Sequence, residues 1–514
     1  MTCKKKIWIV LPIAIAIIFG SLLYYHYFNK KNTISDIEAS ISIDTSSDDI
    51  NWDSYEEKSI TLSNSLTITN QGIYTLTGTL NGNITINTNG NVKLILNGVT
   101  ITSENGPAIY IKNADNVVIS TIEGTTNTLS DSSSYTGFDD VEGAIFSKDD
   151  LVLEGSGTLI VNGNKGDAIV SKDDLIINSG TYIITAEDDG IRGKDSVYLK
   201  DGNFTITSNC DAIKSTNETN SSRGYVKIEN GTFNITTKST DDNASSKGIK
   251  AVNAIIISEG TFNINSTDDA IHSNNIVKIS NGTFEISSDD DGIHADNSLK
   301  VDGGKININK SYEGLEAKNI VINDGVINIV SSDDGINATG KTNSASTLSL
   351  YGGTIRVNAS GDGLDANGSI YIYGGTIYVD GPTSDGDGAL DYDDELVISG
   401  GTLIAVGSSS MAQGISSNST QYGILVNLST SYQQGDIITI TDSENNEVLS
   451  YTANKSFSSI CYSSNALKNG ETYKVKINGV SVQVLTISSI STTVGSVNKD
   501  PGMQGGGGRP GGRH

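Results

Sequence analysis

The sequence predicts an all-β fold, a right-handed parallel β-helix with about 22 residues per coil. The first observation is a motif in which one or two acidic residues precede a small residue and then Ile or Leu. Its small residue recurs at Ala270, Gly292, Gly314 and Gly335, in steps of 22, 22 and 21 residues. The second observation is that each period holds short runs of alternating apolar and polar residues, separated by turns such as Asn281-Gly282. Alternation with period two indicates strands, and three short strands in each period make one coil of a solenoid.

The same phase continues on both sides of this stretch and organises the chain. The small residue also occurs at Ala144, Ala168, Gly190, Ala212, Gly248, Gly363 and Ala389. We therefore expect the regular β-helix over 142–407, preceded by an N-terminal cap and looser first coils over 51–141. A small β subdomain without the 22-residue phase follows over 408–491, since the open end of a solenoid needs an atypical cap. The Gly-rich segment 492–514 is expected to be a disordered tail.

Two irregular steps predict inserted loops. Between Ala212 and Gly248 the step is 36 residues, which exceeds the period by 14. The extra residues fall in two loops, 216–224 and 239–247, and a further insertion covers 340–346. Inserted loops on a solenoid commonly form the walls of a binding face.

The N-terminus predicts a membrane anchor. Lys4, Lys5 and Lys6 precede an apolar run that ends near residue 28, long enough to span a bilayer. The lysines favour the cytoplasmic side, which places the rest of the chain outside the cell. Residues 1–28 are thus expected to be an uncleaved transmembrane anchor, or alternatively a removed signal, and residues 29–50 a polar linker.

Composition limits the class of partner. The chain has 60 acidic and 34 basic residues and a net charge of -26, which excludes the basic footprint of a nucleic-acid-binding protein. Carboxylate oxygens suit calcium, a hard cation. The three cysteines form neither a disulfide framework nor a zinc-binding spacing.

Equivalent residues of successive coils should stack about 4.8 Å apart, so each repeat position forms a column. An acidic column immediately precedes the small residue, with a second acid before several of its members. Carboxylates this close repel and require counter-cations or raised pKa values. We therefore predict calcium ligands in this column, the alternative being simple Asx turns. The predicted ligands are Asp167, Asp188, Asp189, Asp211, Asp268, Asp269, Asp290, Asp291, Asp333, Asp334 and Asp362.

A basic column lies two positions after the small residue and is expected to face solvent. It reads Arg192, Lys214, Lys250, His272 and His294, then Glu316, Asn337, Asp365 and Asp391. The five basic residues are predicted to bind an acidic polysaccharide such as pectate; an ordinary charged surface is the alternative. A third column follows a strand and is interpreted as a structural turn ladder. It contains Asp149, Asp173, Asp195, Asn253, Asn275, Asn297 and Asn319.

Several motifs resemble a known family. They are residues 72–80 (Gly-Ile-Tyr-Thr-Leu-Thr-Gly-Thr-Leu), 92–99, 123–131 and 144–151, the Asp-Asp-Gly-Ile repeats and the Gly-rich C-terminus. On these motifs most of residues 50–490 resembles the extracellular bacterial carbohydrate-binding domain-containing proteins, calcium-binding parallel β-helix proteins that bind cellulose and acidic sugars. The resemblance implies a fold similar to that of calcium-dependent pectate lyases, and binding without catalysis.

Two other classes of function stay open. One is a calcium-dependent polysaccharide lyase acting by β-elimination, in which Arg192, Lys214 or Lys250 would be the base. The other is a structural surface adhesin. The sequence thus predicts an extracellular, cell-surface protein whose partners are calcium, polysaccharide and, through its N-terminus, the membrane.

Overall fold

The computed structural model describes residue 41 and residues 50–239, 245–340 and 345–495. The described chain is built almost wholly of strands, together with a single turn of 3-10 helix, η2 (Trp52–Ser54). It divides into two compact units, residues 1–305 and 306–514.

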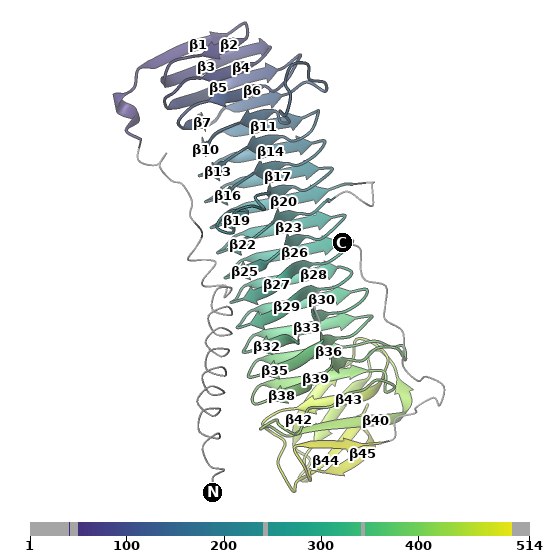
Figure 1. Ribbon diagram of the computed structural model, residues 1–514. Coiled ribbons are helices and arrows are strands. Elements are labelled where there is room, and N and C mark those ends of the chain that lie inside the picture. The colour runs from purple at the N-terminus through teal and green to yellow at the C-terminus, as the bar shows by residue number, and fades with distance from the viewer. Residues whose placement is uncertain (1–40, 42–49, 240–244, 341–344, 496–514) are drawn as a thin grey trace, which may run out of the picture. The chain divides into compact units, whose positions relative to one another are not determined.

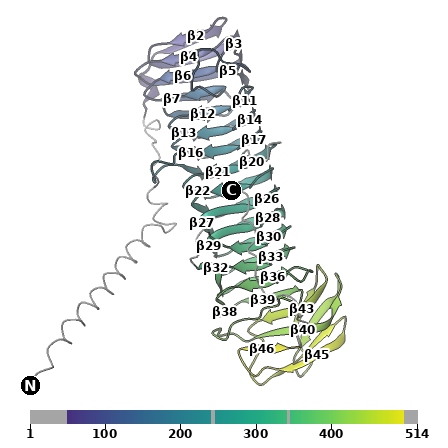
Figure 2. The same cartoon turned by 45° about the vertical axis from the view of Figure 1, so that its right-hand side comes forward.

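Unit 1 consists of coils whose strands pair in parallel with the equivalent strands of the coils before and after (Figures 1 and 2). The strands form three stacks. The first stack contains β2 (Leu66–Ile68), β4 (Ile84–Asn87), β6 (Ile109–Asn113), β9 (Ile145–Ser147), β12 (Ile169–Ser171), β15 (Ile191–Gly193), β18 (Ile213–Ser215), β21 (Ile249–Ala251), β24 (Ile271–Ser273) and the start of β27 (Ile293–Val301). The second contains β1 (Glu57–Leu62), β3 (Gly72–Asn81), β5 (Val92–Thr102), β7 (Val117–Thr121), β10 (Leu151–Gly155), β13 (Asp174–Ile177), β16 (Ser196–Leu199), β19 (Tyr225–Ile228), β22 (Ala254–Ile257), β25 (Ile276–Ile279) and the end of β27. The third continues from β5 through β8 (Thr126–Ser130), β11 (Thr158–Gly163), β14 (Thr181–Ala186), β17 (Asn203–Ser208), β20 (Thr232–Thr237), β23 (Thr261–Ser266) and β26 (Thr283–Ser288).

The register of these stacks follows the sequence period. In the first stack Ile191 pairs with Ile213, Ile213 with Ile249, and Ile271 with Ile293. Each of these isoleucines is fully buried, because alternate side chains of a strand point into the coil. The predicted all-β fold of stacked parallel strands is confirmed, while its right-handedness stays a prediction. The expected loop at 216–224 lies between β18 and β19.

A ladder of aromatic rings fills part of the interior of unit 1. Tyr182, Phe204, Phe233, Phe262 and Phe284 stack in successive coils, with ring centroids 4.6 to 5.1 Å apart. The glycine before each ring leaves space for it. At Gly231 the backbone has a φ of +130°, and an added Cβ would lie 3.0 Å from a ring carbon of Phe233. This close approach explains why Asn-Gly and similar turns recur at this point of the repeat.

Replacing one ring tests the ladder. Phe233 is fully buried and stacks at 4.8 and 4.7 Å on its two neighbours. Phe233→Leu keeps an apolar side chain but loses both ring contacts, so we expect the free energy of unfolding to fall by about 2 kcal/mol. Urea denaturation measures this loss. Thr232→Ala, on an exposed position of the same strand, should change it by less than about 0.5 kcal/mol; equal losses would contradict the ladder's contribution.

Unit 2 repeats the three-stack pattern. Its first stack contains the start of β29 (Leu315–Ile322), β31 (Ile336–Ala338), β34 (Leu364–Ala366) and β37 (Leu390–Tyr392). The second contains the end of β29, β32 (Ser346–Leu350), β35 (Gly368–Ile372) and β38 (Glu395–Ile398). The third contains β28 (Lys305–Lys310), β30 (Val326–Ser331), β33 (Thr354–Ala359), β36 (Thr376–Asp380) and β39 (Thr402–Gly407).

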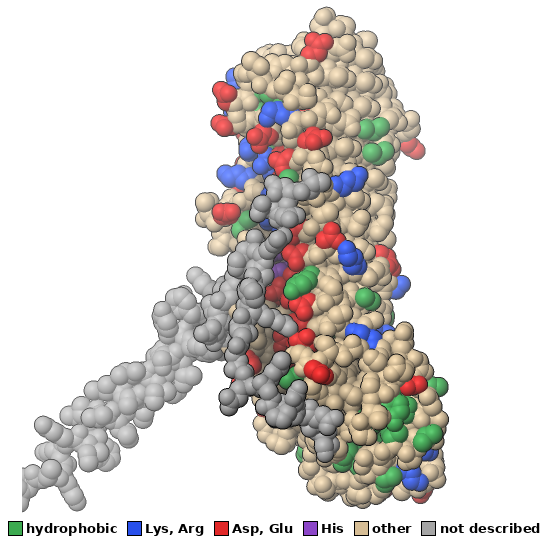
Figure 3. All heavy atoms as spheres, turned by 90° about the vertical axis from the view of Figure 1, so that its right-hand side faces the viewer, with side chains coloured by type: hydrophobic (Ala, Val, Ile, Leu, Met, Phe, Trp, Pro, Cys, Tyr) green, Lys and Arg blue, Asp and Glu red, His purple; other side chains and the backbone are tan. Residues whose placement is uncertain are grey.

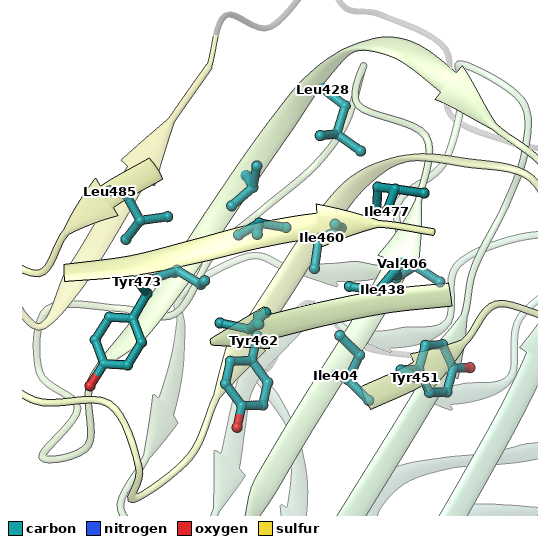
Figure 4. Close-up of a cluster of buried hydrophobic side chains, with 14 of the residues drawn as sticks. Ile404, Val406, Leu428, Ile438, Tyr451, Ile460, Tyr462, Tyr473, Ile477 and Leu485 are labelled. Carbon is teal, nitrogen blue, oxygen red and sulfur yellow. The ribbon is translucent and has the colours of Figure 1, made fainter. Parts of the chain in front are cut away.

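After β39 most pairings are antiparallel, although β40 and β46 pair in parallel. The strands that follow are β40 (Gly423–Tyr432), β41 (Ile437–Thr441), β42 (Glu447–Thr452), β43 (Phe457–Ser463), β44 (Thr472–Ile477), β45 (Val480–Thr486) and β46 (Ser491–Val494). β43 pairs with β39, so it covers the edge of the last coil, which would otherwise expose unpaired backbone groups. Ile404 and Val406 of β39 join Ile438, Ile460 and Tyr473 in one buried cluster (Figure 4).

Five predicted segments fall largely or wholly outside the described residues. They are the anchor 1–28, most of the linker 29–50, residues 240–244 of the loop 239–247, residues 341–344 of the insertion 340–346, and the tail from residue 496 onward. Within the described ranges, no helix is long and apolar enough to cross a membrane.

Candidate functional site

The acidic column of unit 1 is a ladder in which each carboxylate accepts a hydrogen bond from the next coil. The amide N–H of Asp189 donates to Asp167 Oδ1, that of Asp211 to Asp189 Oδ1, and that of Asp291 to Asp269 Oδ1, each at 3.0 Å. These aspartates are buried because they satisfy main-chain groups at the coil corner. Turn chemistry, the alternative to metal binding, therefore accounts for part of the column.

Basic side chains fold back onto this ladder. Lys214 Nζ lies 2.8 Å from Asp211 Oδ2 and 3.2 Å from Asp189 Oδ2, and Arg192 forms an ion pair with Asp167. Lys250 Nζ is 4.0 Å from Asp211 Oδ2 and 2.9 Å from Ser245 Oγ. The predicted stripe of solvent-facing cations needs correction on this point. The side chains leave the coil outward, but they are half-buried and neutralise the buried carboxylates.

The inserted loop before β21 supplies a cation that the sequence columns did not reveal. Lys247 Nζ lies 2.6 Å from Asp268 Oδ1 and 2.8 Å from Asp269 Oδ2. An ammonium group therefore occupies the position between two predicted calcium ligands. Burial, together with the charges of Asp269 and Asp268, raises the pKa of the neighbouring Asp290 to about 6.

Neutralisation along the ladder is uneven. Burial raises the pKa of Asp167 to about 7 and that of Asp189 to about 6, even though Arg192 and Lys214 oppose the shift. At Asp211 burial acts in the same direction, but Lys214 and Lys250 outweigh it and hold the pKa below its ordinary value. Carboxylate oxygens of Asp167, Asp188 and Asp189 lie within 4.8 Å of one another, a spacing that could hold a metal ion.

The two histidines of the basic column pack against each other with their rings tilted by 43° and their centroids 4.6 Å apart. His272 Nδ1 lies 2.6 Å from Asp269 Oδ2, and His294 Nδ1 lies 3.1 Å from Asp291 Oδ2. Both imidazoles are therefore oriented by aspartates of the acidic column.

The column interpreted as a turn ladder makes structural hydrogen bonds. Asp149 Oδ2 accepts the amide N–H of Ala114 at 2.9 Å, and the Asn297 side-chain amide donates to Asn275 Oδ1 at 3.3 Å. Close by, Arg223 of the 216–224 loop reaches back two coils and forms an ion pair of 2.6 Å with the buried Asp174. This loop therefore braces the coil stack.

Unit 2 continues the acidic column, but Glu, Asn and Asp occupy the position that is basic in unit 1. At the position that is basic in unit 1, the register places Asn337 beside Asp365 and Asp365 beside Asp391. Asp334 and Asp362 continue the ladder: Asp334 Oδ1 accepts the amide N–H of Asp362 at 2.6 Å. We call these five residues the unit 2 cluster. Acidic side chains also gather on the face seen in Figure 3.

Among the described residues, one buried oxygen of the unit 2 cluster meets no hydrogen-bond donor. Asn337 is 7% exposed, and its Nδ2 donates to Asp334 Oδ2 at 3.4 Å, while no described donor reaches Asn337 Oδ1. Burying an acceptor in this way is costly unless a donor or a cation meets it. Oxygen ligands of the carboxylate and amide types are those that calcium takes.

The electrostatics of the unit 2 cluster also favour a cation. Burial and then the neighbouring aspartates raise the pKa of Asp362 to about 7 and that of Asp365 to about 8. Within the described ranges, Asp362, Asp365 and Asp391 make no ion pair with Lys, Arg or His. The predicted ligand Asp333 lies beside them at a tight coil corner. A Cβ on Gly361 would come within 2.4 Å of an Asp333 and an Asp334 oxygen.

Three members of the unit 2 cluster were therefore not among the predicted metal ligands. They are Asn337, Asp365 and Asp391, which the sequence placed in the basic column. The signal was present in the change of that column from Lys and His to Asn and Asp.

The carbohydrate-binding domain-containing protein family model matches residues 63–242, 236–292 and 289–499. The chain belongs to this family. A solved structure of the polysaccharide lyase-like protein from C. thermocellum, a gadolinium derivative, is similar at 28% sequence identity; the match covers 48% of this chain and 96% of that one, with a TM-score of 0.39. No curated protein matches the chain. Family membership agrees with the class of function that the sequence predicted.

Proposed function

We propose that the protein is an extracellular, calcium-dependent polysaccharide-binding protein without catalytic activity. Its ligands are plant cell-wall type polysaccharides, chiefly acidic ones such as pectate, with cellulose as a second ligand. Membership of the carbohydrate-binding family supports polysaccharide recognition. The observation that carries the calcium dependence is the unit 2 cluster, in which the Asn337 side-chain oxygen meets no donor among the described residues.

Calcium at this cluster would have a role in recognition. The ion takes six to eight oxygen ligands in all, roughly, and the unit 2 cluster offers oxygens from four aspartates and one asparagine. Two of those aspartates also accept amide hydrogen bonds within the ladder. Positions on the ion therefore remain for water or for the carboxylate of a uronate residue. Such a metal bridge would favour acidic over neutral polysaccharides.

The protonation of Lys214 in the basic column supports polysaccharide binding rather than lysis. A lysine that removes a proton in β-elimination must be uncharged at the working pH. Burial alone would lower the pKa of Lys214, but the carboxylates of Asp211 and Asp189 outweigh burial and hold it above its ordinary value. Lys214 is therefore a fixed cation that stabilises the ladder, and Lys250 is held by Asp211 and Ser245.

The location of the protein is part of the proposal. The apolar segment 7–28 after three lysines would hold the chain on the outer face of the membrane, or direct its secretion if it is cleaved. Plant cell-wall polysaccharides occur outside the cell, which agrees with this location.

A pull-down tests this function. Pectate coupled covalently to beads and insoluble cellulose are each incubated with the protein, with calcium or with a chelator. We expect calcium to increase retention on pectate strongly and on cellulose much less. The Asp362→Asn Asp365→Asn variant should lose the calcium-dependent part, whereas Asp394→Asn, an exposed carboxylate in the same unit, should retain it.

Two outcomes would contradict the proposal. Equal retention of the wild type and the double variant on pectate with calcium would show that calcium bound by Asp362 and Asp365 does not bridge the protein and the polysaccharide. Release of unsaturated uronides, measured by their ultraviolet absorption, would show that the protein is a lyase. The variants Arg192→Ala, Lys214→Ala and Lys250→Ala would then show which side chain acts as the base.

A further inference from the structure

Two similar pairs of side chains lie on neighbouring coils of unit 1. His272 is followed two residues later by Asn274, just after β24, and His294 by Asp296 within β27. Residues two apart on a strand point to the same face, and His272 and His294 are direct partners in the register of β24 and β27. The four side chains therefore form a two-by-two array on the outer surface of the coils.

Every ring nitrogen in this array faces an oxygen. The Nδ1 side of each imidazole meets the carboxylate of Asp269 or Asp291, which accepts an N–H and so fixes the ring. On the opposite side, His272 Nε2 lies 3.2 Å from Asn274 Oδ1, and His294 Nε2 lies 3.3 Å from Asp296 Oδ1. Each Nε2 and its oxygen can be joined by a proton on the ring nitrogen or by a cation that both atoms bind. A second pairing supports the cation, because ligand atoms of Asp269, His272 and His294 also lie within 4.8 Å of one another.

The geometry and the donor types select the kind of cation. Two ligands bound at about 2.0–2.1 Å to a tetrahedral zinc ion lie about 3.4 Å apart, close to the observed Nε2 to oxygen distances. Calcium prefers oxygen ligands, whereas imidazole suits zinc, copper and nickel. A carboxylate that accepts the second ring N–H is also the usual support of a metal-binding histidine. Side-chain exposures of 14% for His272, 19% for His294 and 20% for Asp296 leave the array open to entering ions.

We propose that His272, His294, Asn274 and Asp296 form a binding site for a divalent transition-metal ion of the zinc type, separate in ligand chemistry from the calcium proposed for the unit 2 cluster. Asp269 and Asp291 are positioning residues that fix the imidazoles. The site is independent of the proposed polysaccharide function, and its test does not use polysaccharide.

Zinc titration of the full-length protein by calorimetry, with excess calcium present, tests the site. We expect saturable zinc binding at one equivalent that the His272→Gln His294→Gln variant weakens by about 100-fold or more, and that Asp296→Asn weakens by about tenfold. The matched control is His26→Gln His514→Gln, which removes the other two histidines of the chain and should bind zinc as the wild type does. Cobalt, used as a spectroscopic substitute, should give the intense visible bands of a four-coordinate site in the wild type and in the control.

Circular dichroism of the metal-free variants establishes that they are folded, and Asp296→Asn provides an independent test if the histidine variant does not fold. Unchanged zinc affinity in the folded His272→Gln His294→Gln variant, or unchanged affinity in Asp296→Asn, would overturn the assigned ligands. Absence of zinc binding in the wild type would mean that protons, not a metal ion, satisfy the Nε2 atoms. Displacement of zinc by calcium at equal concentration would exclude a transition-metal site.

Discussion

Lys214→Met is expected to lower the free energy of unfolding of unit 1 by about 3–5 kcal/mol at neutral pH. The ammonium group lies 2.8 Å from Asp211 Oδ2 and 3.2 Å from Asp189 Oδ2, and both carboxylates are almost fully buried. Methionine retains the apolar stem but leaves two buried charges with weaker compensation. Lys250 remains 4.0 Å from Asp211, too distant to replace the lost hydrogen bonds. Urea denaturation at pH 7 measures the loss.

The pH dependence of this loss distinguishes charge from packing. In the wild type the folded-state pKa of Asp211 is lowered, so this carboxylate contributes stability above its unfolded pKa and loses it as the pH falls. The difference between Lys214→Met and wild type should therefore shrink on acidification. Lys58→Met removes an exposed cation that lies 3.2 Å from Glu56, and it should cost less than about 1 kcal/mol. A loss in Lys214→Met that does not depend on pH, or one no larger than in Lys58→Met, would contradict a buried ion pair.

The repeat could be predicted from the sequence because equivalent positions in successive coils of a β-solenoid require the same types of residue. Each coil must place a small residue at the tight corner and a branched apolar residue directly after it, as Gly248-Ile249 and Ala270-Ile271 do. A Cβ at Gly248 would meet the carbonyl oxygen of Ala270 at 2.5 Å, which shows how close the coils approach there. The rings of the aromatic ladder also occupy the same position in successive repeats. The parallel pairing of coils was therefore predictable.

The pairing of charges was much less predictable, because it depends on inserted loops. Lys247 lies outside every column, and Arg223 reaches a carboxylate two coils away. The columns gave the types of residue that meet, but not whether a long side chain folds inward or extends into solvent. The sequence therefore predicts a solvent-facing basic column, whereas in the structure Arg192, Lys214 and Lys250 lie against buried carboxylates. Among the described residues, Asp362, Asp365 and Asp391 of the unit 2 cluster form no ion pair with a lysine, arginine or histidine, which is why we propose calcium there.

Calcium is expected to stabilise the protein strongly at pH 8 and little at pH 5. The pKa of Asp362 is raised to about 7 and that of Asp365 to about 8, from an ordinary value of 3.8. Without metal, the folded state binds protons that the unfolded chain has released, so the free energy of unfolding falls as the pH rises from about 4 to about 8. Calcium requires the deprotonated carboxylates, and its binding therefore releases protons and strengthens over the same range.

Thermal unfolding at the two pH values, with chelator and with calcium, measures both effects. At pH 8 a calcium concentration 100 times the Kd adds about 2.7 kcal/mol to the free energy of unfolding, and chelator should remove this gain. In Asp362→Asn Asp365→Asn the calcium response should disappear, and the melting temperature in chelator should depend less on pH because the two raised carboxyl groups are absent. Asp394→Asn should behave as wild type. If calcium raised the melting temperature equally at pH 5 and pH 8, or if the double variant still responded to it, the ion would have to bind elsewhere, with the Asp167, Asp188 and Asp189 carboxylates of unit 1 as the next site to test.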